Sequence, residues 1–137
     1  MPLTPAITLH LSAALGALLV GPVALWARQG ALQRARWHRA AGYAWITLML
    51  ATAASALFIR DDRLPNIAGY SPLHLLVPLT LWGLYTGFRR LLHHDIAGHR
   101  KAMRGLYFQA CVGAGLFTLL PGRYVGHWVW SEWLGLL

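Results

Sequence analysis

Four of the seven histidines in this chain stand where they could support chemistry. His10 and His74 are each flanked by two leucines, and each begins an apolar stretch. His38 and His99 are each followed by arginine and begin two further apolar stretches. Two imidazoles that face one another inside a helix bundle can supply both axial ligands of a haem iron. Because an ionisable residue inside a membrane helix is a functional candidate, these four histidines are the predicted ligand set.

The spacing of these histidines indicates an internal repeat. His10 and His38 are 28 residues apart, and His74 and His99 are 25 residues apart. Each half of the chain would cross the membrane inward and return, so an axis along the membrane normal would relate the halves. That axis predicts that His10 faces His74 near the outer surface and that the other two face one another near the inner surface. Two haem b groups, each with bis-histidine ligation, would then carry electrons across the bilayer.

Basic residues accompany the inner pair of histidines, and they could bind the propionates of a haem at that membrane face. These predicted cofactor-binding residues are Arg39, Arg100 and Arg104. Iron held by two imidazoles has no open position, so the arrangement suits electron transfer and not oxygen chemistry. The sequence contains no Ser-His-Asp triad, intramembrane carboxylate pair or phosphate-binding loop. Any enzymatic role is therefore expected to be limited to electron transfer.

Other interpretations of the histidines stay open at this point. Histidine near a helix end can reach the lipid headgroups, so all four could be interfacial residues without a ligand. Another metal or a quinone could take the place of haem. Two weaker metal candidates are the run His93-His94-Asp95 and the pair His99 and Met103, which lie four residues apart on one helix face.

Membrane helices are the elements that must position these residues. The chain is 57% hydrophobic and 12% charged, whereas soluble domains carry about 25% charged residues. An apolar stretch of about 20 residues is long enough to span a bilayer. The pattern predicts a single all-α membrane domain over residues 1–137, a four-helix transmembrane bundle that runs up-down-up-down. Its helices are expected over residues 4–26, 37–59, 72–90 and 96–120, followed by a short interfacial helix in the tryptophan-rich tail 123–137.

The distribution of charge predicts the orientation in the membrane. Nine of the twelve lysines and arginines lie around the two connections that join the first helix to the second and the third to the fourth. Basic loops face the cytoplasm, so both termini are expected on the periplasmic side of a bacterial inner membrane. The net charge of +8 then reflects topology, and no nucleic-acid partner is expected. The first apolar stretch has no basic residue before it, which favours a retained helix over a signal peptide.

Four segments resemble a widespread bacterial family of small four-helix membrane proteins that is catalogued as a domain of unknown function. They are LHL at 9–11, WHRAAGYAW at 37–45, SPLHLL at 71–76 and HRKAMRGLYFQACVGAGLFTLLPGR at 99–123. The resemblance covers nearly the whole chain and implies an integral inner-membrane protein, without an established activity. The chain is more distantly similar to di-haem transmembrane cytochromes b that use ascorbate or other reductants. Those proteins also place one histidine on each of four helices, alternating between the membrane faces, but this chain has only four helices and no obvious ascorbate site.

Two functions are therefore expected. The first is a b-type cytochrome-like membrane protein that transfers electrons through bis-histidine haem. The alternative is a haem-free structural or accessory subunit of a larger respiratory or photosynthetic complex. The lipid bilayer is the expected partner in both cases, together with a larger membrane complex or further copies of the chain.

Overall fold

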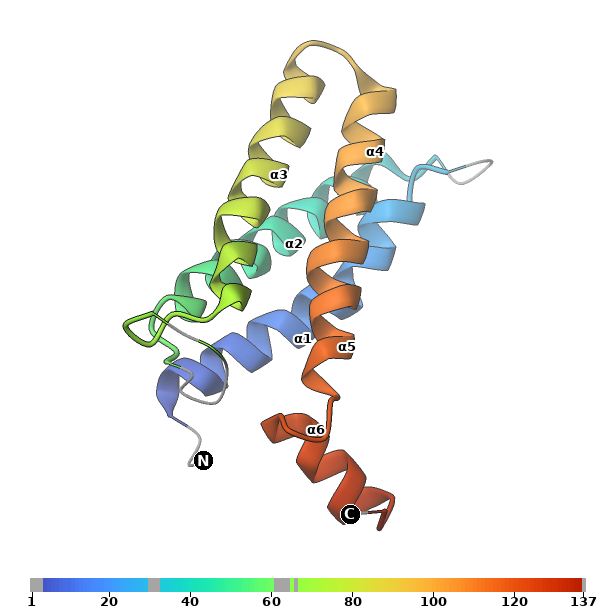
Figure 1. Ribbon diagram of the computed structural model, residues 1–137. Coiled ribbons are helices and arrows are strands. Elements are labelled where there is room, and N and C mark those ends of the chain that lie inside the picture. Colours follow the sequence, from blue (N-terminus) through green and yellow to red (C-terminus); the bar gives the residue numbers. More distant parts are fainter. Residues whose placement is uncertain (1–3, 30–32, 61–64, 66, 137) are drawn as a thin grey trace.

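The computed structural model is all-helical, as Figure 1 shows. It describes residues 4–29, 33–60, 65 and 67–136, so residues 1–3, 30–32, 61–64, 66 and 137 of the predicted domain lie outside the described residues. Apart from one isolated bridge between Ile67 and Tyr70, the described residues contain no β-structure. The all-α fold class predicted from the sequence is confirmed.

The first two helices, α1 (Pro5–Trp26) and α2 (Ala35–Ala56), form an antiparallel hairpin. Thr4 caps the start of α1, where its hydroxyl accepts a hydrogen bond from the Ile7 N–H at 3.3 Å. The buried residues of α1 recur every three or four positions and are all small: Ala13, Ala17, Gly21 and Ala24. Such a stripe lets neighbouring helices approach closely.

The second hairpin starts with a short 3₁₀ helix, η1 (Pro72–Leu75), which leads into α3 (Leu76–Leu92). The chain then reverses and continues through three consecutive helical elements, α4 (Ile96–Leu106), the π-helix η2 (Tyr107–Gly113) and α5 (Ala114–Thr118). Asp95 caps α4, because its carboxylate accepts from the Gly98 N–H at 2.8 Å. A last helical segment, α6 (Tyr124–Trp128) with the π-helix η3 (Val129–Trp133), lies in the predicted tail. Its position at a membrane surface stays a prediction.

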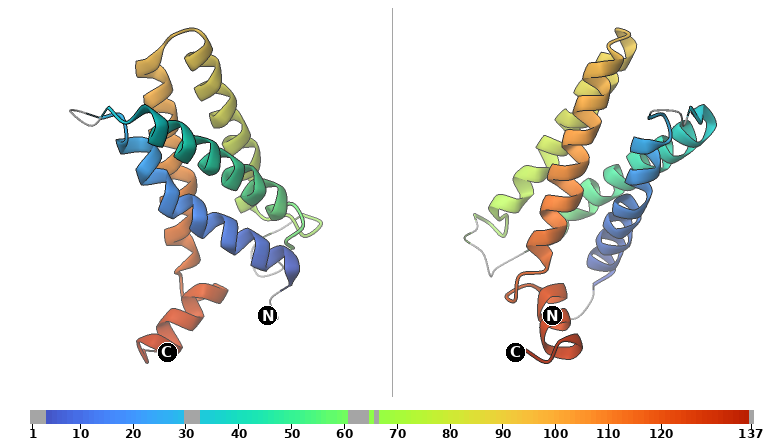
Figure 2. Two further views of the ribbon diagram at one scale, coloured as in Figure 1. Left: turned by 180° about the vertical axis from the view of Figure 1, so that it is seen from behind. Right: turned by 90° about the vertical axis from the view of Figure 1, so that its right-hand side faces the viewer.

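The two hairpins cross at an angle instead of aligning as one parallel-sided bundle. In Figures 1 and 2 the last turn of α1 and the first turn of α2 lie well apart from the α3–α4 connection, so the hairpins diverge toward these two ends. They meet where α1 contacts α4 and η2 and where α2 contacts α3. The predicted up-down-up-down four-helix transmembrane bundle is therefore not confirmed by this arrangement.

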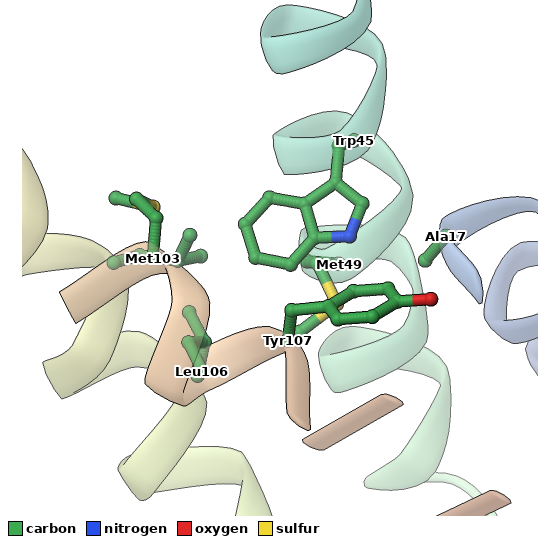
Figure 3. Close-up of a cluster of buried hydrophobic side chains, with 7 residues drawn as sticks. Ala17, Trp45, Met49, Met103, Leu106 and Tyr107 are labelled. Atoms are coloured by element: carbon green, nitrogen blue, oxygen red, sulfur yellow. The ribbon is translucent and has the colours of Figure 1, made fainter. Parts of the chain in front are cut away.

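A cluster of large side chains at this junction accounts for the crossing. Trp45 and Met49 of α2 pack with Tyr107 of η2, and all three are buried. Figure 3 shows the Tyr107 ring beside Trp45 and Met49, with its hydroxyl directed toward α1. Gly21 of α1 makes room for this ring, because a Cβ atom at that position would overlap it. The Tyr107 ring therefore packs closely against Gly21 at the place where the hairpins meet.

Membrane character is distributed unevenly over the described helices. Among them only α1 is both long enough and apolar enough to cross a bilayer by itself. The elements α4, η2 and α5 follow one another without a break, but the α4 part is basic. A bundle of four transmembrane helices stays a prediction.

Candidate functional site

His38 and His99, the predicted inner pair, are held in the same way in the two hairpins. His38 Nδ1 donates to the Ala24 carbonyl of α1 at 2.7 Å, and His99 Nδ1 donates to the Gly87 carbonyl of α3 at 2.9 Å. In each case the second helix of a hairpin bonds the first, to a residue 14 or 12 positions earlier. Ala24 lies in the last turn of α1, where carbonyl groups have no partner within the helix. These matching bonds support the internal repeat.

The two bonds also determine the tautomer of each ring. A carbonyl oxygen can only accept, so Nδ1 must carry a proton, and in the neutral imidazole Nε2 keeps its lone pair. Within the described part of the chain, neither Nε2 atom has a hydrogen-bond partner. A histidine that ligates a metal usually has this arrangement, with its other ring nitrogen donating to a carbonyl or carboxylate group.

The inner pair does not meet in this structure. His38 is in the first turns of α2 and His99 in the first turn of α4, at the diverging ends of the two hairpins (Figure 2). Neither residue lines the cavity described below. The three arginines predicted to accompany them are exposed, and none forms an ion pair with a described residue: Arg39, Arg100 and Arg104.

His10 and His74, the predicted outer pair, do share a cavity of about 240 Å³ between the two hairpins. Helices α1, α2, α3 and α5 and the π-helix η2 contribute to its mostly apolar wall. His10 Nδ1 lies 3.0 Å from the Thr52 carbonyl and 3.2 Å from the Ser55 hydroxyl of α2. Because the carbonyl must accept, Nδ1 carries the proton and Nε2 of His10 is again left with a lone pair.

His74 differs from the other three histidines, because both of its ring nitrogens are engaged. The Ser71 N–H donates to Nδ1 at 3.1 Å, and Nε2 donates to the Ile59 carbonyl at 3.0 Å. The ring of Tyr70 packs edge-on against it, with 5.0 Å between the ring centroids. These contacts tie η1 to the chain that follows α2. His74 could ligate a metal through Nε2 only after losing the bond to Ile59.

Thr80 is a polar residue of the cavity that the sequence analysis missed. It is 6% exposed and lines the cavity from α3. Its hydroxyl makes no hydrogen bond with any described residue. A signal for it was present, because the buried residues of α3 recur at helical spacing and include this threonine: Val77, Thr80, Leu84 and Gly87.

The run His93-His94-Asp95 finds no support as a metal site in the described residues, and the pair His99 and Met103 stays a prediction. No group of three or more His, Cys, Asp or Glu side chains there could hold a metal ion. His93 and His94 are exposed, and the backbone of His94 is left-handed, with φ 59°. Asp95 is engaged with Gly98 and with Arg90, whose Nη1 lies 2.9 Å from the carboxylate. The hydrogen bond from Gly98, followed by that from Arg90, holds the pKa of Asp95 below its ordinary value.

Comparison with known proteins gives a family and no activity. No curated protein and no solved structure matches this chain, so the likeness to di-haem cytochromes b stays a prediction. One family profile, described as "Predicted membrane protein (DUF2306)", matches residues 7–131. That range contains all four of the histidines and almost every described helix. The chain is therefore a member of this family of predicted membrane proteins, DUF2306.

Proposed function

We propose that this membrane protein binds haem b through His38 and His99 and transfers electrons within the membrane. The observation that carries the proposal is the matched anchoring of the two rings, each through Nδ1 to a carbonyl of the preceding helix. Such a bond orients an imidazole and raises the basicity of Nε2, which is the atom that would bind the iron. One ring comes from each hairpin, and because the two rings lie at the diverging ends, ligation of one haem by both would require these ends to come together.

The surroundings of the inner pair are compatible with a dianionic cofactor. Arg39 is next to His38, and Arg100 is next to His99, with Arg104 one turn further along α4. Guanidinium groups bind carboxylates through paired charge-assisted hydrogen bonds, so these side chains would hold the propionates. Bound haem would supply reversible one-electron transfer, and the two imidazoles would leave its iron without an open position.

The outer pair does not fit a second haem equally well. The Nε2 atom of His74 already donates to the Ile59 carbonyl. The shared cavity of about 240 Å³ is also below the range of about 300–1,000 Å³ that is typical of small-molecule sites. The proposal is therefore confined to the inner pair.

The membrane arrangement belongs to the same proposal. The basic ends of both hairpins, where the inner pair lies, would face the cytoplasm, and both termini would be periplasmic. The four helical segments would cross a bacterial inner membrane as two hairpins. Insertion of cysteine labels into the α1–α2 connection and into the tail would test this, because only the tail should react with an impermeant reagent in intact cells.

Visible absorption of the purified protein tests the haem proposal. Protein produced in cells supplied with haem should show a Soret band and, after reduction, a sharp α-band. The single variants His38→Ala and His99→Ala should each lose these bands while keeping the helical circular dichroism signal. His93→Ala is the control, because its ring is exposed and makes no hydrogen bond with a described residue. Full haem content in both single variants would refute the assignment.

A second candidate function is the haem-free accessory subunit. The tail favours it, because Trp128, Trp133 and Leu136 expose large apolar side chains that the described residues do not cover. Protein that is colourless, fully helical and recovered with a larger membrane complex would support this candidate over haem binding. Loss of that complex on truncation of residues 124–136 would place the contact in the tail.

A further inference from the structure

The wall of the cavity between the hairpins contains polar side-chain groups that haem ligation does not explain. Its wall is mostly carbon, and most of its polar groups are already paired. The Thr52 hydroxyl donates to the Leu48 carbonyl at 2.8 Å. The Thr118 hydroxyl donates to the Gly115 carbonyl at 2.7 Å. Both nitrogens of the His74 ring are bonded, as described above.

Two polar groups of the wall are left over, and they come from different hairpins. One is Nε2 of His10 on α1, which can only accept, because Nδ1 holds the proton. The other is the hydroxyl of Thr80 on α3, which lines the cavity and has no described hydrogen-bond partner. Each of these two groups can therefore pair with a polar atom of a ligand in the cavity.

The cavity has room for a small ring compound. An apolar protein cavity of about 150 Å³ is large enough for benzene. The volume of about 240 Å³ therefore suits one six-membered ring with a short apolar substituent. A larger polar molecule would leave its own polar groups unpaired against the apolar wall.

We propose that this cavity binds a small apolar ring compound that carries a hydroxyl group. The hydroxyl donates to Nε2 of His10, and its oxygen accepts from the hydroxyl of Thr80. The ring lies among the apolar side chains of both hairpins. A ligand bound in this way bridges α1 and α3 and stabilises the crossing of the hairpins. The proposal uses neither His38 nor His99, so it stands or falls independently of haem binding.

Two probes of nearly the same shape test this inference. The first is 4-propylphenol, and the second is its methyl ether 4-propylanisole, which has no hydroxyl hydrogen to donate. Both are titrated into the full-length protein in detergent micelles, and binding is followed by the rise in Tm that a ligand of the folded state produces. The phenol should bind the wild-type protein about 3- to 10-fold more tightly than the ether, as one buried hydrogen bond predicts.

Two variants remove the proposed partners, and Thr80→Val does so with almost no change in the shape of the wall. His10→Asn keeps an N–H that can reach the Thr52 carbonyl but lacks the Nε2 acceptor. Thr80→Val replaces the hydroxyl by a methyl group. Both should abolish the preference for the phenol.

The matched control is Thr86→Val, the same change two turns further along α3. Its hydroxyl donates to the Gly83 carbonyl at 3.1 Å and it does not line this cavity. The control should keep the preference for the phenol. Equal binding of the two probes to the wild-type protein, or an unchanged preference in both His10→Asn and Thr80→Val, would overturn the inference.

Discussion

Substitution of Tyr107 by phenylalanine should destabilise the protein through a backbone group on a different helix. Pro22 lies inside α1 and has no N–H, so the Leu18 carbonyl four residues earlier loses its partner in the helix. The Tyr107 hydroxyl replaces that partner, with its oxygen 3.0 Å from the Leu18 oxygen. Tyr107 is 6% exposed, so water does not readily take the place of the hydroxyl.

The magnitude follows from what remains after the substitution. Interhelical hydrogen bonds in membrane proteins contribute about 0.6 kcal/mol on average, because the separated groups find other partners. The Leu18 carbonyl has no such partner within α1, since Pro22 occupies the donor position. The cost of a buried acceptor left unpaired is about 1–3 kcal/mol, and we expect Tyr107→Phe to fall in that range.

Unfolding in mixed micelles, followed by circular dichroism, measures this cost. Tyr85→Phe is the control, because Tyr85 is 54% exposed and its hydroxyl makes no hydrogen bond with a described residue. Measuring the effect of Tyr107→Phe also in a Pro22→Ala variant makes the test specific. Pro22→Ala restores an N–H that can bond the Leu18 carbonyl, so Tyr107→Phe should cost much less in that background. An equal cost in both backgrounds would refute the role assigned to Pro22.

Three further substitutions test the packing and capping described above. Gly21→Ala should destabilise the protein by about 1–3 kcal/mol, because the new Cβ overlaps the Tyr107 ring. The control is Gly42→Ala, which should be neutral or stabilising because there is open space around Gly42. Equal effects of the two substitutions in a chemical unfolding assay would contradict the packing of Tyr107 against Gly21. Thr4→Ala should lower the free energy of unfolding by about 0.5–2 kcal/mol through loss of the α1 cap, and a free energy of unfolding equal to wild type would argue against the cap. Asp95 has a lowered pKa in the folded protein, so its contribution to stability is present above the unfolded pKa and is lost as the pH falls through the folded pKa. Asp95→Asn should therefore flatten the decline in stability at acid pH, and an unchanged pH profile would speak against this cap.

The positions of the helices could be predicted because their signals are local. Stretches of helical length that are largely apolar, with Thr4, Ser71 and Asp95 before three of them, placed every long helix close to its observed bounds. The family relationship was also visible in short segments, and the match over residues 7–131 agrees with it. Apolar periodicity and caps depend on neighbours within a turn or two, so one sequence is sufficient to recognise them.

The state of the four histidines was decided by tertiary structure. Their sequence surroundings come in two similar pairs, yet only His74 has both ring nitrogens engaged. The partners of His10, His38 and His99 are carbonyl groups 42, 14 and 12 residues away, and any residue type can provide a carbonyl. A sequence pattern contains no signal for such a partner.

The sequence by itself determined that this chain forms long apolar helices, which helical segments carry the histidines, and which ends of those helices are basic. Tertiary structure alone decided that the hairpins cross and that Tyr107 packs against Gly21 where they meet. It also decided that Thr80 lines a cavity shared with His10. The physical reason is that helix formation follows from short-range periodicity, whereas cavities and ring orientations depend on how distant surfaces pack.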